Sequence, residues 1–194
     1  MINCVRPQMI TIHKQQYQKL SNIYLIGPMG SGKTSLGKQF GNLTGNRFYD
    51  SDIEIEKRTG ADIPWIFKWE GEEGFRKRET QVIDSLCKFN NIILATGGGC
   101  ILNEANRRFL SENGIVIYLT VSIETQLKRI SRTGKDRPLF FIQHNSKKKL
   151  QELNEKRRPL YQSIADFIYQ SDHLKPPELS MQILTDIKKF IISL

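Results

Sequence analysis

Residues 27–34 read GPMGSGKT, and this stretch decides the fold class. It fits the pattern G-x-x-x-x-G-K-[ST] in full. The apolar run Ile23–Ile26 predicts a buried strand directly before it, and residues 35–44 carry apolar side chains at helical spacing directly after it. A glycine-rich loop between a strand and a helix turns backbone N–H groups toward one point at the helix N-terminus, where an anion is favoured. The stretch therefore predicts a loop that binds the phosphates of a nucleotide.

Two side chains at the end of this loop supply groups that a nucleotide needs. Lys33 is expected to reach the β- and γ-phosphates, and the Thr34 hydroxyl is expected to ligate Mg²⁺. The predicted ATP-binding residues here are Gly30, Ser31, Gly32, Lys33, Thr34 and Ser35. Nucleotide switches, motors and small-molecule kinases all use such a loop, so the loop alone does not define the reaction.

Short apolar strands alternate with helical segments along the rest of the chain. Further strands are expected at Arg47–Tyr49, Ile92–Ala95, Ile115–Leu119 and Asp166–Tyr169. Residues 61–88 interrupt the rhythm, because Pro64, Gly71 and Gly74 are expected to cut them into short helices. The alternation predicts an α/β fold with a parallel sheet that is covered on both faces.

The length of 194 residues predicts one domain over residues 21–194, preceded by a tail over residues 1–20. There is no run of 18 or more apolar residues, and the polar first residues lack the apolar core of a secretory signal. Cys4, Cys87 and Cys100 form neither a disulfide framework nor a zinc pattern, which fits a reducing cytosol. We expect a cytoplasmic protein that binds no membrane.

The net charge of +9, from 29 basic and 20 acidic residues, has two interpretations. Basic residues neutralise nucleic-acid phosphates, or they gather around one cleft that binds small anions. A nucleic-acid-binding module built on the phosphate loop is the less favoured alternative, because no RNA-recognition or zinc pattern accompanies it. The run Lys147–Lys149 is interpreted as the solvated start of a helix, and no nucleic-acid partner is expected.

Two carboxylates and a glycine turn follow two of the predicted strands. Asp50 and Asp52 lie at the end of the second predicted strand, and ligands of parallel sheets bind where strands end. Alternating strand geometry predicts that both carboxylates face one side, one for Mg²⁺ and the other for a hydrogen bond or a proton from a substrate hydroxyl. A helix N-cap explains either aspartate equally well. The turn at residues 96–99, TGGG, lets backbone N–H groups approach a ligand, although a tight turn explains it equally well.

Four arginines are candidates for binding anions: Arg76, Arg132, Arg137 and Arg157. Each is more often a solvated surface charge when it is considered alone. Arg137 lies between Asp136 and Pro138, in a segment where a lid that carries a cation is expected.

From about Asn22 to the C-terminus the sequence resembles shikimate kinases. The resemblance rests on GPMGSGKT (27–34), FYDSDIEIEKRTG (48–60), GEEGFRKRE (71–79), LATGGG (94–99), RTGKDRPL (132–139) and EKRRPLY (155–161). It implies a three-layer, nucleoside-monophosphate-kinase-like fold with a five-stranded parallel sheet. It also implies a small helical substrate-binding insertion over about 52–88 and a mobile lid over about 132–145. The implied reaction transfers the γ-phosphate of ATP to the 3-hydroxyl of shikimate, in the pathway to chorismate and aromatic amino acids.

The resemblance also implies roles for the acceptor site. Asp52 would hold the reacting hydroxyl and is the best candidate for the base. Arg76 and Arg157 would bind the shikimate carboxylate, with the adjacent Arg158 as an alternative to Arg157. The ring would contact the glycine turn, formed by Gly97, Gly98 and Gly99.

On the nucleotide side, the resemblance implies that Asp50 organises Mg²⁺ beside Thr34 and that Arg137 closes on the phosphates. Arg132 and the loop around Leu174 would flank the adenine. The expected ligands are ATP and shikimate, with Mg²⁺ as cofactor, and we expect a monomer. Another small-molecule kinase, such as a gluconate kinase, is the nearest alternative. The two aspartates, the glycine turn and the separated arginines favour a cyclic acid with vicinal hydroxyls.

Overall fold

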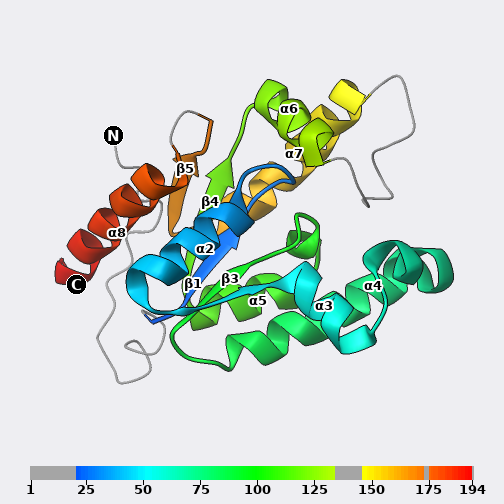
Figure 1. Ribbon diagram of the computed structural model, residues 1–194, viewed down its shortest axis with the longest axis horizontal. Coiled ribbons are helices and arrows are strands. Elements are labelled where there is room, and N and C mark those ends of the chain that lie inside the picture. The colour runs from blue at the N-terminus through cyan, green and yellow to red at the C-terminus, as the bar shows by residue number, and fades with distance from the viewer. Residues whose placement is uncertain (1–20, 134–145, 173–174, 194) are drawn as a thin grey trace.

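The computed structural model describes residues 21–133, 146–172 and 175–193 and shows a sheet between two layers of helices (Figure 1). The strands are β1 (Ile23–Ile26), β2 (Arg47–Asp50), β3 (Ile92–Ala95), β4 (Ile115–Thr120) and β5 (Phe167–Gln170). Their order across the sheet is β2-β3-β1-β4-β5, and all pairs are parallel. The predicted α/β fold with a five-stranded parallel sheet is confirmed.

Helices connect the strands. Three of them, α2 (Lys33–Thr44), α3 (Ser51–Thr59) and α4 (Ile63–Cys87), precede β3. The 3₁₀ turn η1 (Cys100–Leu102) and α5 (Glu104–Asn113) lead to β4, and α6 (Ile123–Thr133) and α7 (Ser146–Ile164) lead to β5. Helix α8 (Pro176–Ile192) follows β5. None of the helices described is both long and apolar enough to cross a membrane.

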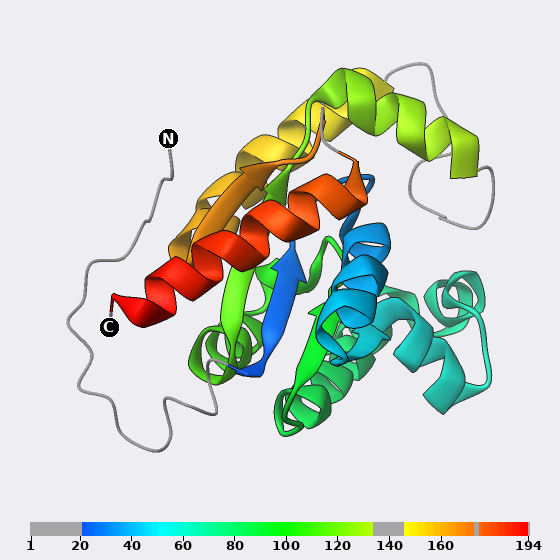
Figure 2. The same ribbon diagram turned by 60° about the vertical axis from the view of Figure 1, so that its left-hand side comes forward.

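The strands separate two apolar cores. In β1, Tyr24 and Ile26 face one core together with residues of α4, α5 and α7. Ile23 and Leu25 face the opposite core, under α2 and α8, which Figure 2 shows on the same face of the sheet. A strand buried on both faces must be apolar throughout, which explains the uninterrupted apolar runs in the sequence.

Helix α4 corrects the expectation of several short helices over residues 61–88. Only Gly71 has a non-helical backbone inside it, with φ 68° and ψ −172°, so the predicted break at Gly71 is confirmed as a kink where two helices meet. Pro64 lies in the first turn, where its missing N–H group is tolerated, and the Asp62 carboxylate caps this turn by accepting from the Trp65 N–H at 2.8 Å. Gly74 continues the helix, so the predicted breaks at Pro64 and Gly74 are wrong.

The predicted subdomain over residues 52–88 corresponds to α3 and α4, and Figure 1 shows α3 and the first half of α4 projecting from the sheet. Its boundaries stay a prediction. The predicted tail over residues 1–20 lies outside the described residues. So do residues 134–145 of the predicted lid, with Arg137, and so does Leu174.

Candidate active site

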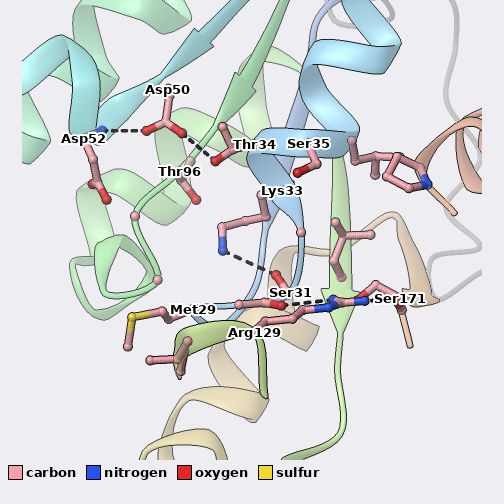
Figure 3. A pocket seen from close by; sticks show the side chains of 18 of the residues that line it. Met29, Ser31, Lys33, Thr34, Ser35, Asp50, Asp52, Thr96, Arg129 and Ser171 are labelled. Atoms are coloured by element: carbon pink, nitrogen blue, oxygen red, sulfur yellow. Dashed lines mark hydrogen bonds between the residues drawn. The ribbon is translucent and has the colours of Figure 1, made fainter. Parts of the chain in front are cut away.

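A cleft of about 480 Å³ opens where the central strands end (Figure 3). It lies between the phosphate loop, the start of α3, the glycine turn, the end of α6 and the start of α8. The predicted site residues that line it are Gly30, Ser31, Gly32, Lys33, Thr34, Ser35, Asp50, Asp52, Gly97, Gly98 and Arg132. The nucleotide half of the predicted site therefore shares one cleft with Asp52, Gly97 and Gly98, whereas Gly99, Arg76 and Arg157 are not among the residues that line it.

Lys33 is the first residue of α2 and is buried at the centre of the phosphate loop. Its ammonium donates to the carbonyl oxygens of Gly27 at 2.8 Å and Pro28 at 2.9 Å. It also lies 3.4 Å from Ser31 Oγ. The loop thus holds a positive charge beside the N-terminus of α2, where an arriving phosphate oxygen can replace a carbonyl oxygen.

Asp50 connects the phosphate loop to α3. Its Oδ2 accepts from the Thr34 hydroxyl at 2.8 Å, and its Oδ1 accepts from the Asp52 N–H at 3.1 Å. The alternative interpretation of Asp50 as a helix N-cap is confirmed, and the same carboxylate also meets the phosphate loop. Asp52 lies in the first turn of α3 and not on the strand, so the prediction that alternating strand geometry places it was wrong. The helical turn brings it to the same cleft as Asp50.

The Thr34 hydroxyl and the Asp50 carboxylate form a donor set that fits Mg²⁺. They are oxygen ligands, they lie 2.8 Å apart, and both line the cleft beside the phosphate loop. Mg²⁺ in nucleotide sites is usually held by one or two protein oxygens together with waters and phosphates. The residues present therefore suit an ion that arrives with the nucleotide.

The glycine turn is closely surrounded by charged side chains. A methyl group at Gly97 would lie 2.7 Å from Glu79 Oε1 and 2.8 Å from Asp52 Oδ1, and one at Gly99 would collide with the Arg76 guanidinium. The Gly97 N–H donates to Ser51 Oγ at 2.8 Å, which ties the turn to the start of α3. A larger residue at Gly97 or Gly99 would therefore displace the charged ends of these side chains, so the glycines let the turn approach them closely.

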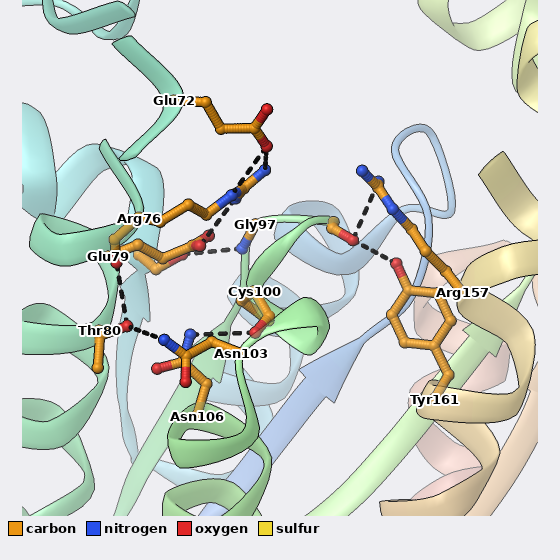
Figure 4. A network of polar contacts seen from close by, with 12 residues as sticks. Glu72, Arg76, Glu79, Thr80, Gly97, Cys100, Asn103, Asn106, Arg157 and Tyr161 are labelled. Carbon is orange, nitrogen blue, oxygen red and sulfur yellow. Dashed lines mark hydrogen bonds and ion pairs between the residues drawn. The ribbon is translucent and has the colours of Figure 1, made fainter. Parts of the chain in front are cut away.

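Glu79 is a site residue that the sequence analysis missed. It is fully buried, and its Oε2 accepts from Arg76 Nη1 at 2.8 Å (Figure 4). Glu72, on the preceding turn, accepts from Arg76 Nη2 at 3.0 Å. Burial raises the pKa of Glu79 to about 7, although the positive charge of Arg76 opposes this rise. The available signal was the spacing of three residues between Arg76 and Glu79, which places both on one helix face.

Arg157 reaches the glycine turn from the opposite side. Its Nη1 donates to the Gly98 carbonyl at 3.3 Å, and the Tyr161 hydroxyl donates to the same oxygen. Figure 4 shows Arg76, from α4, and Arg157, from α7, on either side of the turn. Arg158 is exposed; burial raises the pKa of the Tyr118 phenol, and the positive charge of Arg158 opposes part of this rise. The structure thus brings Arg157, and not Arg158, to the turn.

At the other end of the cleft, Arg132 lies in the last turn of α6, and Pro176 and Leu179 of α8 also line the wall. Arg129, one turn earlier, was not singled out from the sequence. Its guanidinium donates to the Gly30 carbonyl at 3.0 Å and to the Ser171 carbonyl at 2.7 Å. Arg129 therefore fastens the phosphate loop to α6 and to the end of β5.

The comparison with protein families decides between the small-molecule kinases. The family described as shikimate kinase matches residues 29–188 of this chain. The chain belongs to the shikimate kinase family. This confirms the resemblance seen in the six separated motifs.

Individual shikimate kinases are similar over nearly the whole chain. One from Coxiella burnetii (strain Dugway 5J108-111) is 62% identical over 172 residues, which cover 89% of this chain and 96% of that protein. One from Acinetobacter baylyi is 47% identical over 170 residues, 88% of this chain and 93% of that protein. The structure of shikimate kinase from Acinetobacter baumannii in complex with shikimate superposes with a TM-score of 0.84 at 45% identity, covering 90% and 97% of the two chains.

A gluconokinase from Sinorhizobium meliloti has the same fold at lower similarity. It superposes with a TM-score of 0.51 at 16% identity and covers 90% of this chain and 94% of its own. This likeness concerns the fold alone.

Proposed function

We propose that this protein is a shikimate kinase that transfers the γ-phosphate of ATP to the 3-hydroxyl of shikimate. The products are shikimate 3-phosphate and ADP, in the pathway to chorismate and aromatic amino acids. The observation that carries the proposal is the glycine turn, which meets Asp52 and Arg76 on one side and Arg157 on the other, while Gly97 and Gly98 of the turn line the cleft of the phosphate loop. Family membership over residues 29–188 supports the same conclusion.

The reaction needs positioning and charge stabilisation more than covalent help from the protein. The 3-hydroxyl oxygen attacks the γ-phosphorus, and the bond from that phosphorus to the β,γ-bridging oxygen breaks, so that its electron pair leaves with ADP. Asp52 accepts the hydrogen bond of the hydroxyl and takes its proton as the new bond forms. Lys33 binds the β- and γ-phosphates, and its ammonium stabilises their negative charge.

The acceptor carboxylate is bound by Arg76 and Arg157. A planar guanidinium presents two N–H groups that match a carboxylate, which an ammonium cannot do. Arg76 is held for this task by Glu79 and Glu72, at 2.8 and 3.0 Å. The backbone of Gly97, Gly98 and Gly99 lies between the two arginines and faces the ring.

Thr34 and Asp50 would hold Mg²⁺, which neutralises phosphate charge when it is bound. Asp50→Asn is expected to raise the free Mg²⁺ needed for half-maximal rate about 10-fold, because the site loses its negative charge. The melting temperature should change little, since asparagine caps a helix as well as aspartate does. Initial rates over a Mg²⁺ series test this.

The control for that series is Asp84→Asn, which removes a carboxylate on α4 that pairs with Lys88, just after the helix, at 2.7 Å. It should leave the Mg²⁺ dependence unchanged. An unchanged Mg²⁺ dependence in Asp50→Asn would remove Asp50 from the metal site.

The assignment of Arg137 as the lid arginine comes from the sequence. We expect Arg137→Ala to lower kcat about 10³-fold, because an arginine that closes on the phosphates stabilises charge that develops in the transition state. The KM for shikimate should stay within about threefold. Steady-state kinetics with each substrate varied check this, and an effect confined to the shikimate KM would place Arg137 in the acceptor site instead.

The proposed function is tested by one coupled assay that offers ATP with shikimate, with gluconate or with nucleoside monophosphates. Release of ADP with shikimate is expected, and turnover with gluconate alone would remove the assignment. Shikimate 3-phosphate, identified by mass spectrometry and NMR, establishes which hydroxyl is phosphorylated.

We also propose that the enzyme is a cytoplasmic monomer with no nucleic-acid partner. The buried thiols of Cys87 and Cys100 are free, as proteins of a reducing compartment usually have them. Lys147 forms an exposed ion pair with Glu124 at 3.3 Å, as a solvated helix start does. Light scattering should give the monomer mass, and a gel shift at physiological salt would contradict the absence of nucleic-acid binding.

A further inference from the structure

The carbonyl oxygen of Gly98 receives two hydrogen bonds from one face of α7. Arg157 Nη1 lies 3.3 Å from it, and the Tyr161 hydroxyl lies 2.5 Å from it (Figure 4). Arg157 and Tyr161 are four residues apart, so they project from successive turns of the same helix face. A carbonyl oxygen has two lone pairs and accommodates both donors.

The two donors differ in how firmly they are held. Tyr161 is 1% exposed, and its ring stacks on Tyr118 with centroids 4.8 Å apart and planes inclined by 20°. Burial raises the pKa of Tyr161 far above its usual value, so the phenol stays protonated and remains a donor. Arg157 makes the longer bond and is only half-buried. Arg157 is therefore the donor that can leave Gly98, and Tyr161 is the one that stays.

Gly98 also touches the phosphate loop. A methyl group at Gly98 would lie 3.3 Å from the Met29 nitrogen and 3.4 Å from the Gly27 carbonyl oxygen. The position of Gly98 therefore determines how the glycine turn lies against the phosphate loop, which binds the nucleotide. A Gly98 carbonyl that loses its donors would be free to turn, and the acceptor site would shift against the phosphates.

We propose that Tyr161 is a positioning residue, which keeps the Gly98 carbonyl hydrogen-bonded when Arg157 turns from it to the carboxylate of the acceptor. This inference rests on the proposed function. Without the phenol hydroxyl, Arg157 would be the carbonyl's remaining donor among the described residues, and an Arg157 that turned to the acceptor would leave the carbonyl without one. With the acceptor bound, the Gly98 carbonyl would then lose its hydrogen bonds from α7.

Tyr161→Phe tests the proposal, because it removes the hydroxyl and keeps the ring stacked on Tyr118. Wild-type turnover of shikimate is measured first and tests the proposed function by itself. The variant should raise the shikimate KM about 10-fold and leave the ATP KM and kcat within about twofold. The matched control is Tyr118→Phe, the same change on the partner ring, whose hydroxyl bonds to no other described residue; it should leave all three constants within about twofold.

A second measurement excludes a merely structural role. An analogue in which a methyl group replaces the carboxylate offers Arg157 no hydrogen-bond acceptor, so Tyr161→Phe should not weaken its binding relative to wild type. An equal loss for shikimate and for the analogue would overturn the proposal, as would a parallel rise in the ATP KM or no change in the shikimate KM.

A third measurement needs no variant and covers the case in which Tyr161→Phe does not fold. A crystal structure of the wild type with shikimate should show Arg157 on the carboxylate and the Tyr161 hydroxyl still on the Gly98 carbonyl. A Tyr161 hydroxyl that has left Gly98, or an Arg157 that remains there, would overturn the inference.

Discussion

Asp52→Asn is expected to lower kcat about 10³-fold while ATP binding stays as in the wild type. Asp52 lies in the first turn of α3 and lines the cleft beside the glycine turn. Asparagine has the same shape and keeps the backbone N–H that donates to Asp50, so the start of α3 should be preserved. It carries no charge and takes no proton, so the attacking hydroxyl loses its anionic partner.

Two measurements distinguish a loss of catalysis at Asp52 from a disturbance of the neighbouring phosphate loop. Calorimetry gives the ATP affinity, and the coupled assay gives kcat and the shikimate KM. Asp62→Asn is a suitable control, because Asp62 is an exposed helix cap on α4 that asparagine can replace. Near-normal turnover would remove Asp52 from the role of base, and weakened ATP binding would mean that the change disturbs the phosphate loop through Asp50.

Arg76→Ala is expected to raise the shikimate KM about 10²-fold, because a pair of charge-assisted hydrogen bonds to the carboxylate is lost. It should also lower the free energy of unfolding by about 3 kcal/mol above pH 7, since a buried carboxylate without its partner is strongly destabilising. The carboxylate concerned is that of Glu79, which is fully buried and pairs with Arg76 at 2.8 Å.

The pH dependence of this loss has a definite sign. The pKa of Glu79 is about 7 in the folded protein, above its ordinary 4.5, because of burial. The native state then binds the proton more tightly than the unfolded chain, so this stabilisation is complete below pH 4.5 and is lost as pH rises through 7. Arg76 opposes the rise, so its removal should steepen the loss of stability between pH 5 and pH 8.

The double variant Arg76→Ala with Glu79→Gln separates folding from binding. The neutral glutamine has no charge to bury, so chemical denaturation at pH 8 should show most of the stability restored. The shikimate KM should remain high, because the guanidinium is still missing. If the double variant recovered both properties, Arg76 would serve the fold and not the acceptor carboxylate.

Local pattern was enough for the sheet and the phosphate loop. The apolar runs at Ile23–Ile26 and Ile92–Ala95 are strands with the predicted bounds, because a strand buried on both faces needs apolar residues throughout. The stretch GPMGSGKT connects β1 to α2 and includes the first two residues of α2, Lys33 and Thr34, as its glycines and its helix start require. These features depend on backbone conformation over a few consecutive residues, which the residue types themselves dictate.

Packing between distant segments determined which side chains form the acceptor half of the site. Residue type alone could not choose Arg157 over Arg158, since the choice depends on which face of α7 meets a turn that lies 59 residues earlier in the chain. Glu79 resembles other surface acids of a charged helix until α4 packs against the glycine turn and buries it beside Arg76 and Asp52. Burial and the meeting of side chains across elements are properties of the assembled layers, and no short window of sequence contains them.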